Sequence, residues 1–254
     1  REDLEVPQNV PSGYLLLKIL GSSICGTDID MIKGNPWTKE NVWPKMVEGH
    51  DLILGHEFFG KVIKTGTNTK VKTDQVGACE SHYPCPSCIK KGIDGHTCDN
   101  YGIFGVWGYK KKDGTYAPSL GGAFSEYILV PEMNFYDVSP IYKNFHCSLI
   151  EPAGNTWSII EDLKNRGLPE NMLVFGSGPH GLNLQIFAEY HGVKNIVVVE
   201  PDDFRRGFAK GIGAGNIFLK PNQLTKDFVN QITKGKGFDV ICDMVGLKVV
   251  VDKV

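Results

Sequence analysis

The hexapeptide GSGPHG, Gly176 to Gly181, is the feature that most limits what this chain can fold into. It follows the short apolar run NMLVFG and opens PHGLNLQIFAEYHG, which has the periodicity of an amphipathic helix. In the pattern G-x-G-x-x-G the first glycine permits a tight turn, the second lets the backbone approach a pyrophosphate, and the third lets the helix pack closely on the strand. The free N–H groups at the helix N-terminus favour phosphate. The segment therefore predicts the first strand, loop and helix of a dinucleotide-binding domain.

An acidic residue follows at the expected spacing. Glu200 ends the apolar run NIVVVE, about 20 residues beyond the glycines, where a carboxylate accepts hydrogen bonds from the adenosine ribose hydroxyls. Its charge would repel a 2′-phosphate, which favours NAD over NADP, although Arg205 and Arg206 lie close enough to bind a phosphate. The residues assigned to cofactor binding are Gly176, Gly178, Pro179, His180, Gly181, Glu200 and Arg205.

The sequence changes character near residue 150, which predicts two domains. Residues 1–150 alternate the β-rich runs YLLLKIL, GKVIKTG and FSEYILVP with Gly/Pro-rich turns, as in a compact all-β domain. In residues 151–254 apolar strands alternate with helices, which implies a parallel sheet buried on both faces; the helical stretch Trp157 to Asn171 is the expected connector. We count about four strands before the sequence stops in LKVVVDKV, whereas a doubly wound sheet has about six, so the C-terminal part is expected to be missing.

Composition excludes several classes of partner. A chain of 254 residues with 41% hydrophobic content can bury a core in each of two domains. The formal charge of −2 and the lack of any Lys/Arg-rich run predict neither a nucleic acid nor a membrane as partner. The apolar runs are too short to span a bilayer and the N-terminal residues do not resemble a signal peptide. We expect a cytoplasmic protein.

Three short motifs supply candidate metal ligands. Cys25 lies in ICGTD, His56 and Glu57 lie in LGHEFFG, and Glu151 lies in IEPAGN. One thiolate, one imidazole and one carboxylate make a set that suits catalytic zinc, which takes three protein ligands and keeps a fourth position open. The seven cysteines are spread unevenly, and such clustering in a cytoplasmic chain indicates metal before disulfide. Cys147 and Cys242 are expected in the core.

These motifs carry a family resemblance over nearly the whole chain. C-G-T-D, G-H-E, a C-x-x-C cluster and E-P before the glycine fingerprint, in this order, resemble the zinc-dependent medium-chain dehydrogenases. Within that family, ESHYPC, EPAGN and VEPDDFRRGFAKGIGA are most similar to the threonine 3-dehydrogenases, and the sorbitol-type polyol dehydrogenases come next. The resemblance implies a GroES-like catalytic domain followed by a Rossmann domain, zinc and NAD as cofactors, a small-molecule alcohol as substrate, and a homodimer or homotetramer.

The resemblance also implies roles around the catalytic zinc. Cys25, His56 and Glu151 would be its ligands. Glu57 would sit beside the ion and could exchange onto it during turnover. Zinc would act as a Lewis acid on the alcohol, and NAD would accept the hydride.

Four further positions follow from the same resemblance. Asp28 would hydrogen-bond the far nitrogen of the histidine ligand and fix its tautomer. Thr27 would pass a proton from the substrate hydroxyl. Asp30 stands where many relatives have a histidine that completes the proton relay. His82, in ESHYPC, either contacts a polar group of the substrate or is a surface loop histidine.

The second cysteine cluster departs from the family pattern, in which four cysteines bind a structural zinc. The possible ligands here are Cys85, Cys88 and Cys98. Lys91 stands where the third of the four cysteines would fall. Either the site is degenerate, or His96 or Asp94 completes it.

The sequence leaves three functional readings open. The first is a zinc alcohol dehydrogenase acting on a polar secondary alcohol, with L-threonine first and a polyol or cyclitol second. Another is a catalytically inactive zinc- and NAD-binding module of the same fold. The last is a reductase of activated double bonds, but such relatives lack the cysteine, histidine and glutamate set.

Overall fold

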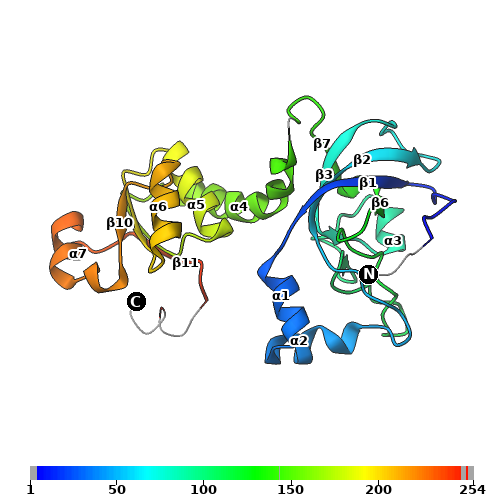
Figure 1. Cartoon of the computed structure of the whole chain (residues 1–254), viewed down its shortest axis with the longest axis horizontal. Helices are drawn as coiled ribbons and strands as arrows, with labels where there is room; N and C mark the ends of the chain where they lie inside the picture. Colours follow the sequence, from blue (N-terminus) through cyan, green and yellow to red (C-terminus); the bar gives the residue numbers. More distant parts are fainter. Residues whose placement is uncertain (1–4, 143, 247–249, 251–254) are drawn as a thin grey trace. The chain divides into compact units, whose positions relative to one another are not determined.

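The computed structural model describes residues 5–142, 144–246 and 250 (Figure 1). The predicted last stretch, LKVVVDKV, lies outside the described residues except for Val250. The chain divides into two compact units, Arg1–Glu151 and Pro152–Val254. The first unit contains, in order, β1 Tyr14–Ser23, α1 Gly26–Lys33, α2 Pro36–Asn41, η1 Trp43–Lys45, β2 Glu57–Thr65, β3 Val76–Cys79, β4 His82–Tyr83, α3 Pro86–Ile89, β5 Gly102–Ile103, β6 Tyr127–Pro131, η2 Glu132–Asn134, β7 Phe135–Asp137 and η3 Phe145–Leu149.

An antiparallel sheet of five strands, in the order β6-β1-β2-β3-β7, forms the frame of the first unit. Leu15 and Leu17 of β1 lie two residues apart, so they share one face of the strand, and both enter the main core with Phe58 and Val62 of β2. The sheet therefore brings the ends of β1 and β2, where Cys25 and His56 lie, beside each other: Ser23 pairs with Glu57.

The first unit also contains helices, which the expectation of an all-β domain did not include. α1 begins directly after Cys25, its N-cap, and ends at Gly34, whose φ of 61° is the left-handed conformation that glycine adopts at a helix C-terminus. α2 follows at once because Asn35 accepts a hydrogen bond of 2.8 Å from the Thr38 N–H and Pro36 occupies the first helical position. The segment ICGTD is thus a strand-to-helix junction.

The second unit is a parallel sheet with helices. Its elements are α4 Ile150–Arg166, which begins in the last residues of the first unit, β8 Asn171–Phe175, α5 Pro179–Tyr190, β9 Asn195–Val199, α6 Asp203–Gly211, β10 Ile217–Leu219, η4 Pro221–Gln223, α7 Lys226–Thr233 and β11 Val240–Asp243. The sheet has the order β10-β9-β8-β11 with every pair parallel. This is the 3-2-1-4 arrangement of a partial Rossmann sheet, so the predicted fold class is confirmed.

Both faces of the parallel sheet are covered. Met172 and Val174 of β8 pack with Ile160 of α4 and Leu184 of α5 on one face. The alternating residues, Leu173 and Phe175, enter a second cluster that includes Phe228 and Ile232 of α7. Two-sided burial explains why the strands read as continuous apolar runs. The helical connector expected from Trp157 begins seven residues earlier, at Ile150.

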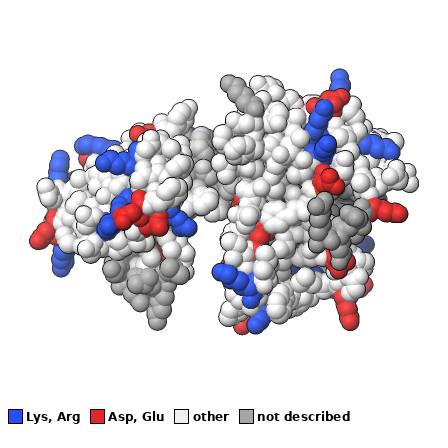
Figure 2. Space-filling view, in the orientation of Figure 1, with Lys and Arg blue, Asp and Glu red and all other residues white. Residues whose placement is uncertain are grey.

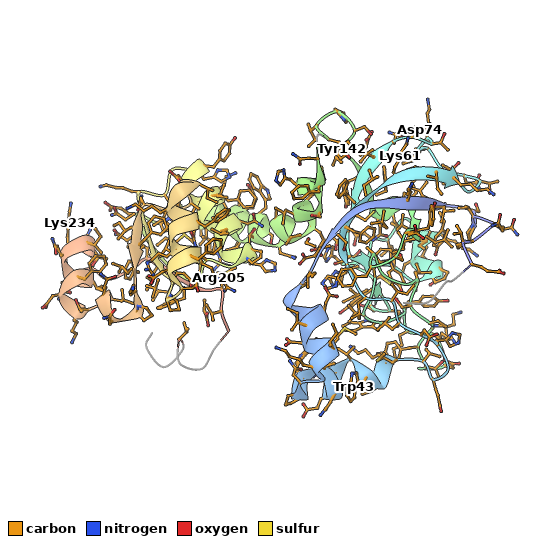
Figure 3. The ribbon with its side chains drawn as sticks, in the orientation of Figure 1. Trp43, Lys61, Asp74, Tyr142, Arg205 and Lys234 are labelled. Atoms are coloured by element: carbon orange, nitrogen blue, oxygen red, sulfur yellow. The ribbon has the colours of Figure 1, made fainter. Side chains whose placement is uncertain are left out.

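The surface shows mixed charge. On the face in Figure 2, lysine and arginine side chains are interspersed with acidic ones, and some pair directly, such as Lys61 and Asp74, whose Nζ and Oδ1 lie 2.7 Å apart (Figure 3). Within the described residues, no helix has the length and apolar content that crossing a bilayer requires.

Candidate functional site

Asp28 is fully buried and contacts both segments that carry the predicted ligands. Its Oδ2 accepts a hydrogen bond of 2.9 Å from the Cys25 N–H, and its Oδ1 accepts one of 3.2 Å from the Gly55 N–H. Oδ1 also lies 3.5 Å from Nδ1 of His56, as expected for a carboxylate that orients a ligand histidine. Burial opposes the charged form of Asp28, but the hydrogen bonds from His56, Cys25 and Gly55 outweigh it and lower the pKa of the carboxyl.

Donor atoms of Cys25, His56 and Glu57 lie within 4.8 Å of one another. Both His56 and Glu57 are buried, and Cys25 is half-buried at the N-terminus of α1, where helical N–H groups stabilise a negative charge. Burial disfavours charge on His56, but hydrogen bonds to Asp28 and Cys25 raise the pKa of the ring to about 10. Thiol, imidazole and carboxylate in this arrangement suit a zinc ion.

Glu151 lies near this group without being part of it. The metal-ligand group found among the described residues takes its carboxylate from Glu57. Glu151, in the first turn of α4, has a pKa raised by burial, while a hydrogen bond to Ser81 and the charge of His56 act in the opposite direction. The expected roles of the two carboxylates therefore remain a prediction: Glu151 as a zinc ligand and Glu57 beside the ion. Thr27 is half-buried in the first turn of α1.

The thiols of Cys85, Cys88 and Cys98 form a second group within 4.8 Å, consistent with a zinc site. Neither of the two candidates for a fourth ligand, Asp94 and His96, belongs to this group. Asp94 accepts hydrogen bonds from the N–H and hydroxyl of Thr97, at 2.9 and 2.8 Å. The His96 ring contacts the carboxylate of Glu80. Within the part of the chain that the structure describes, the cluster offers three protein donors.

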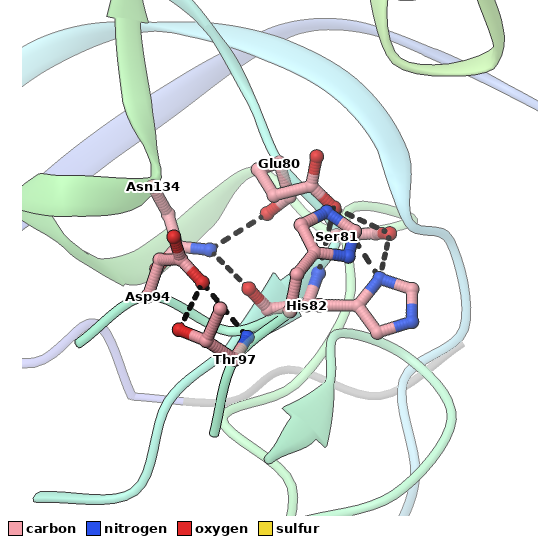
Figure 4. A network of polar contacts seen from close by, with 7 residues as sticks. Glu80, Ser81, His82, Asp94, Thr97 and Asn134 are labelled. Atoms are coloured by element: carbon pink, nitrogen blue, oxygen red, sulfur yellow. Dashed lines mark hydrogen bonds and ion pairs between the residues drawn. The ribbon is translucent and has the colours of Figure 1, made fainter. Parts of the chain in front are cut away.

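A third donor group, which was not predicted from the sequence, consists of Glu80, His82 and His96. Figure 4 labels Glu80 and His82 of this group. Both imidazoles approach one carboxylate oxygen: Nδ1 of His82 and Nε2 of His96 each lie 3.3 Å from Oε1 of Glu80. Burial opposes charge on Glu80, but hydrogen bonds from both histidines outweigh it and lower the pKa of the carboxyl to about 2. Glu80 and His82 are two residues apart in the sequence, with a bend at Ser81 between them, and β4 begins at His82.

The backbone of the glycine loop leaves no room for a side chain at two of its three glycines. Gly176 has a φ of 94°, which favours glycine, and a Cβ on Gly181 would lie 2.2 Å from the Gly176 carbonyl oxygen. A Cβ on Gly178 would meet nothing within 4 Å, so this glycine leaves open space at the N-terminus of α5. This geometry is compatible with a pyrophosphate at the N-terminus of α5, and the assignment of the three glycines to cofactor binding remains a prediction.

Glu200 anchors the same loop. Its carboxylate is buried and accepts hydrogen bonds from the N–H groups of Ser177 and Asp202, at 2.8 and 2.9 Å. The guanidinium of Arg206 donates a hydrogen bond to the Glu200 carbonyl oxygen and pairs with Asp203. Arg205 is exposed on α6, and its side chain forms no ion pair within the described residues (Figure 3).

Comparison with known proteins gives the family. Residues 11–140 match the alcohol dehydrogenase GroES-like domain. This chain belongs to the medium-chain alcohol dehydrogenase family. It is 31% identical to the L-threonine 3-dehydrogenase of Pyrococcus furiosus over 250 residues, which are 96% of this chain. The chain spans 65% of the length of that relative.

Solved alcohol dehydrogenase structures share the fold. The 2R,3R-butanediol dehydrogenase of Bacillus subtilis superposes with a TM-score of 0.76 at 25% identity, covering 98% of this chain and 68% of its own. An alcohol dehydrogenase of E. coli complexed with the cofactor NADH gives a TM-score of 0.71 at 25% identity, covering 98% of this chain and 67% of its own. The predicted family resemblance and the GroES-like domain are confirmed.

Proposed function

We propose that the protein is a zinc-dependent oxidoreductase that transfers hydride from a polar secondary alcohol to NAD. The observation that supports this most strongly is the convergence of Cys25, His56 and Glu57 in a chain that also carries the glycine loop. When bound, zinc supplies a Lewis acid for the alcohol oxygen and NAD supplies the hydride acceptor. The first unit would be the catalytic zinc domain and the second the nucleotide domain.

The residues around the proposed zinc site have distinct tasks. Cys25 and His56 hold the ion, together with Glu151 or Glu57. Asp28 holds both segments in place through its contacts with the Cys25 N–H and the His56 ring. Thr27, in the first turn of α1, takes the proton of the substrate hydroxyl and passes it outward.

On the nucleotide side, the N-terminus of α5 would bind the pyrophosphate over the open space at Gly178. Each Glu200 oxygen accepts one backbone N–H, and a carboxylate has about four acceptor sites, so capacity is left for the ribose hydroxyls. Arg205, Pro179 and His180 complete the proposed contacts.

The proposed substrate is L-threonine, because the curated relative named above is an L-threonine 3-dehydrogenase. A polyol or cyclitol is the alternative. Cys85, Cys88 and Cys98 would hold a structural zinc, and the protein would be a homodimer or homotetramer.

The test is a screen of NAD reduction by the purified, zinc-loaded chain with L-threonine, sorbitol, inositols and 2-butanol. We expect the fastest NADH formation with L-threonine, and loss of activity in His56→Asn but not in His50→Asn, since His50 is exposed outside the donor groups. A rate with threonine no higher than with 2-butanol would remove threonine as the substrate. NAD binding without NADH formation from any alcohol would indicate an inactive binding module instead.

A further inference from the structure

We infer that Glu80, His82 and His96 form a binding site for a divalent transition-metal ion, separate from both cysteine-containing groups. The three side chains come from two segments: Glu80 and His82 flank the start of β4, and His96 lies in the loop between α3 and β5. This inference does not depend on the proposed oxidoreductase activity.

The donor geometry fits a metal ion. Tetrahedral ligands at Zn–N and Zn–O distances of about 2.0–2.1 Å are separated from one another by about 3.3 Å. Nδ1 of His82 and Nε2 of His96 each lie 3.3 Å from Oε1 of Glu80. Each imidazole presents a lone pair at that nitrogen when its proton is on the other nitrogen. An ion could therefore be bound without a large movement of the side chains.

The backbone holds the donors in this arrangement. The amide of Asn134, which is buried, donates hydrogen bonds of 2.9 and 2.7 Å to the carbonyl oxygens of Glu80 and His82 (Figure 4). The loop with His96 lies directly against the same carbonyl, since a Cβ on Gly95 would be 2.0 Å from the His82 oxygen. Preorganised ligands of this kind raise metal affinity.

The donor types select the ion. Two imidazoles and one carboxylate suit zinc, cobalt, iron or nickel, whereas calcium and magnesium prefer oxygen ligands alone. Side-chain exposures of 28% for Glu80, 30% for His82 and 59% for His96 leave the remaining coordination positions accessible to water or a small ligand. The site would therefore bind zinc or cobalt with open positions, and His82 would be a metal ligand rather than a direct substrate contact.

The test compares metal content in the full chain after removal of metal and dialysis against Zn²⁺. We expect His96→Asn and Glu80→Gln each to bind one zinc equivalent fewer than the wild type, whereas His50→Asn binds as many. Because His96 is largely exposed, its replacement leaves the fold intact, which circular dichroism melting checks.

Cobalt distinguishes this site from the thiolate sites. Co²⁺ bound to cysteine gives an intense sulfur charge-transfer band, and Co²⁺ bound to histidine and carboxylate does not. We expect His96→Asn to lose one Co²⁺ equivalent with no loss of the sulfur band. Two outcomes would overturn the inference. One is a metal content of His96→Asn and Glu80→Gln equal to that of the wild type. The other is a loss of the sulfur charge-transfer band together with the lost Co²⁺ equivalent.

Discussion

The backbone N–H of Cys25 donates a 2.9 Å hydrogen bond to the buried carboxylate of Asp28. The other oxygen of that carboxylate faces Gly55 and His56, in a segment that begins 27 residues later in the chain. One side chain thus fixes the relative position of two candidate metal ligands that the sequence separates.

Asp28→Asn should weaken zinc binding at the Cys25 and His56 group about 10- to 100-fold, the usual effect of changing a carboxylate that orients a ligand histidine. The asparagine amide has the shape of the aspartate carboxylate. Its NH₂ group, however, would face one of the N–H groups that donate to Asp28 and could not accept that hydrogen bond. Chelator competition measures the affinity, and Asp30→Asn, on the same helix, is the matched control. An affinity equal to that of the wild type would show that Asp28 does not orient the site.

Two glycines of the nucleotide loop should respond differently to alanine. In Gly181→Ala the new methyl group meets the Gly176 carbonyl oxygen, so we expect the free energy of unfolding to fall by about 1–3 kcal/mol. In Gly178→Ala the new methyl group meets open space, so the free energy of unfolding should change by less than about 0.5 kcal/mol. The affinity for NAD should fall. Denaturant unfolding and NADH fluorescence titration measure the two quantities. Unchanged NADH binding in Gly178→Ala would contradict the proposed pyrophosphate position.

Cys98→Ser should remove one zinc equivalent and lower the melting temperature, because a zinc site contributes folding free energy. The Cys98 sulfur also accepts a 3.4 Å hydrogen bond from the Cys85 N–H, which connects the two ends of the cysteine segment. The control is Cys242→Ser, in β11 and outside the donor groups. If a chelator lowers the melting temperature of wild type and Cys98→Ser equally, the cluster holds no structural ion.

The pKa of Glu80, lowered to about 2, predicts a pH-dependent contribution to stability in the metal-free protein. A carboxyl with a depressed folded-state pKa stabilises the fold above its unfolded pKa of about 4.5, and this stability is lost as pH falls toward 2. The difference in free energy of unfolding between wild type and Glu80→Gln should therefore be full at pH 6 and shrink steadily below about 4.5. Denaturant titrations across this range check it, and a difference that grows on acidification would have the wrong sign.

The sequence predicted best where a local pattern sets the backbone. NMLVFG, NIVVVE and the glycine hexapeptide form β8, β9 and the loop before α5, because apolar runs bounded by glycine leave few alternatives. The parallel sheet and its four described strands followed from the same patterns.

Features that depend on tertiary contacts were not predictable in this way. The expectation of an all-β domain included no helix after Cys25, but α1 begins there and Asp28 accepts a hydrogen bond from the Cys25 N–H. Glu80 and His96 are 16 positions apart with no shared motif, and they meet where the loop at Gly95 packs on the His82 carbonyl. His96, one of the two candidates for the fourth ligand of the three cysteines, lies 3.3 Å from Glu80 and belongs to a different donor group.

Ser81 is almost fully buried, and it contacts both His82 of the third donor group and Glu151, the carboxylate expected at the catalytic zinc. Its hydroxyl oxygen lies 3.1 Å from Nδ1 of His82, and it also hydrogen-bonds the side chain of Glu151. A hydroxyl has a single proton to donate, so its orientation toward one neighbour withdraws it from the other. We therefore expect an ion bound at one of these sites to change the affinity of the other, and thermodynamic linkage requires both affinities to change by the same factor.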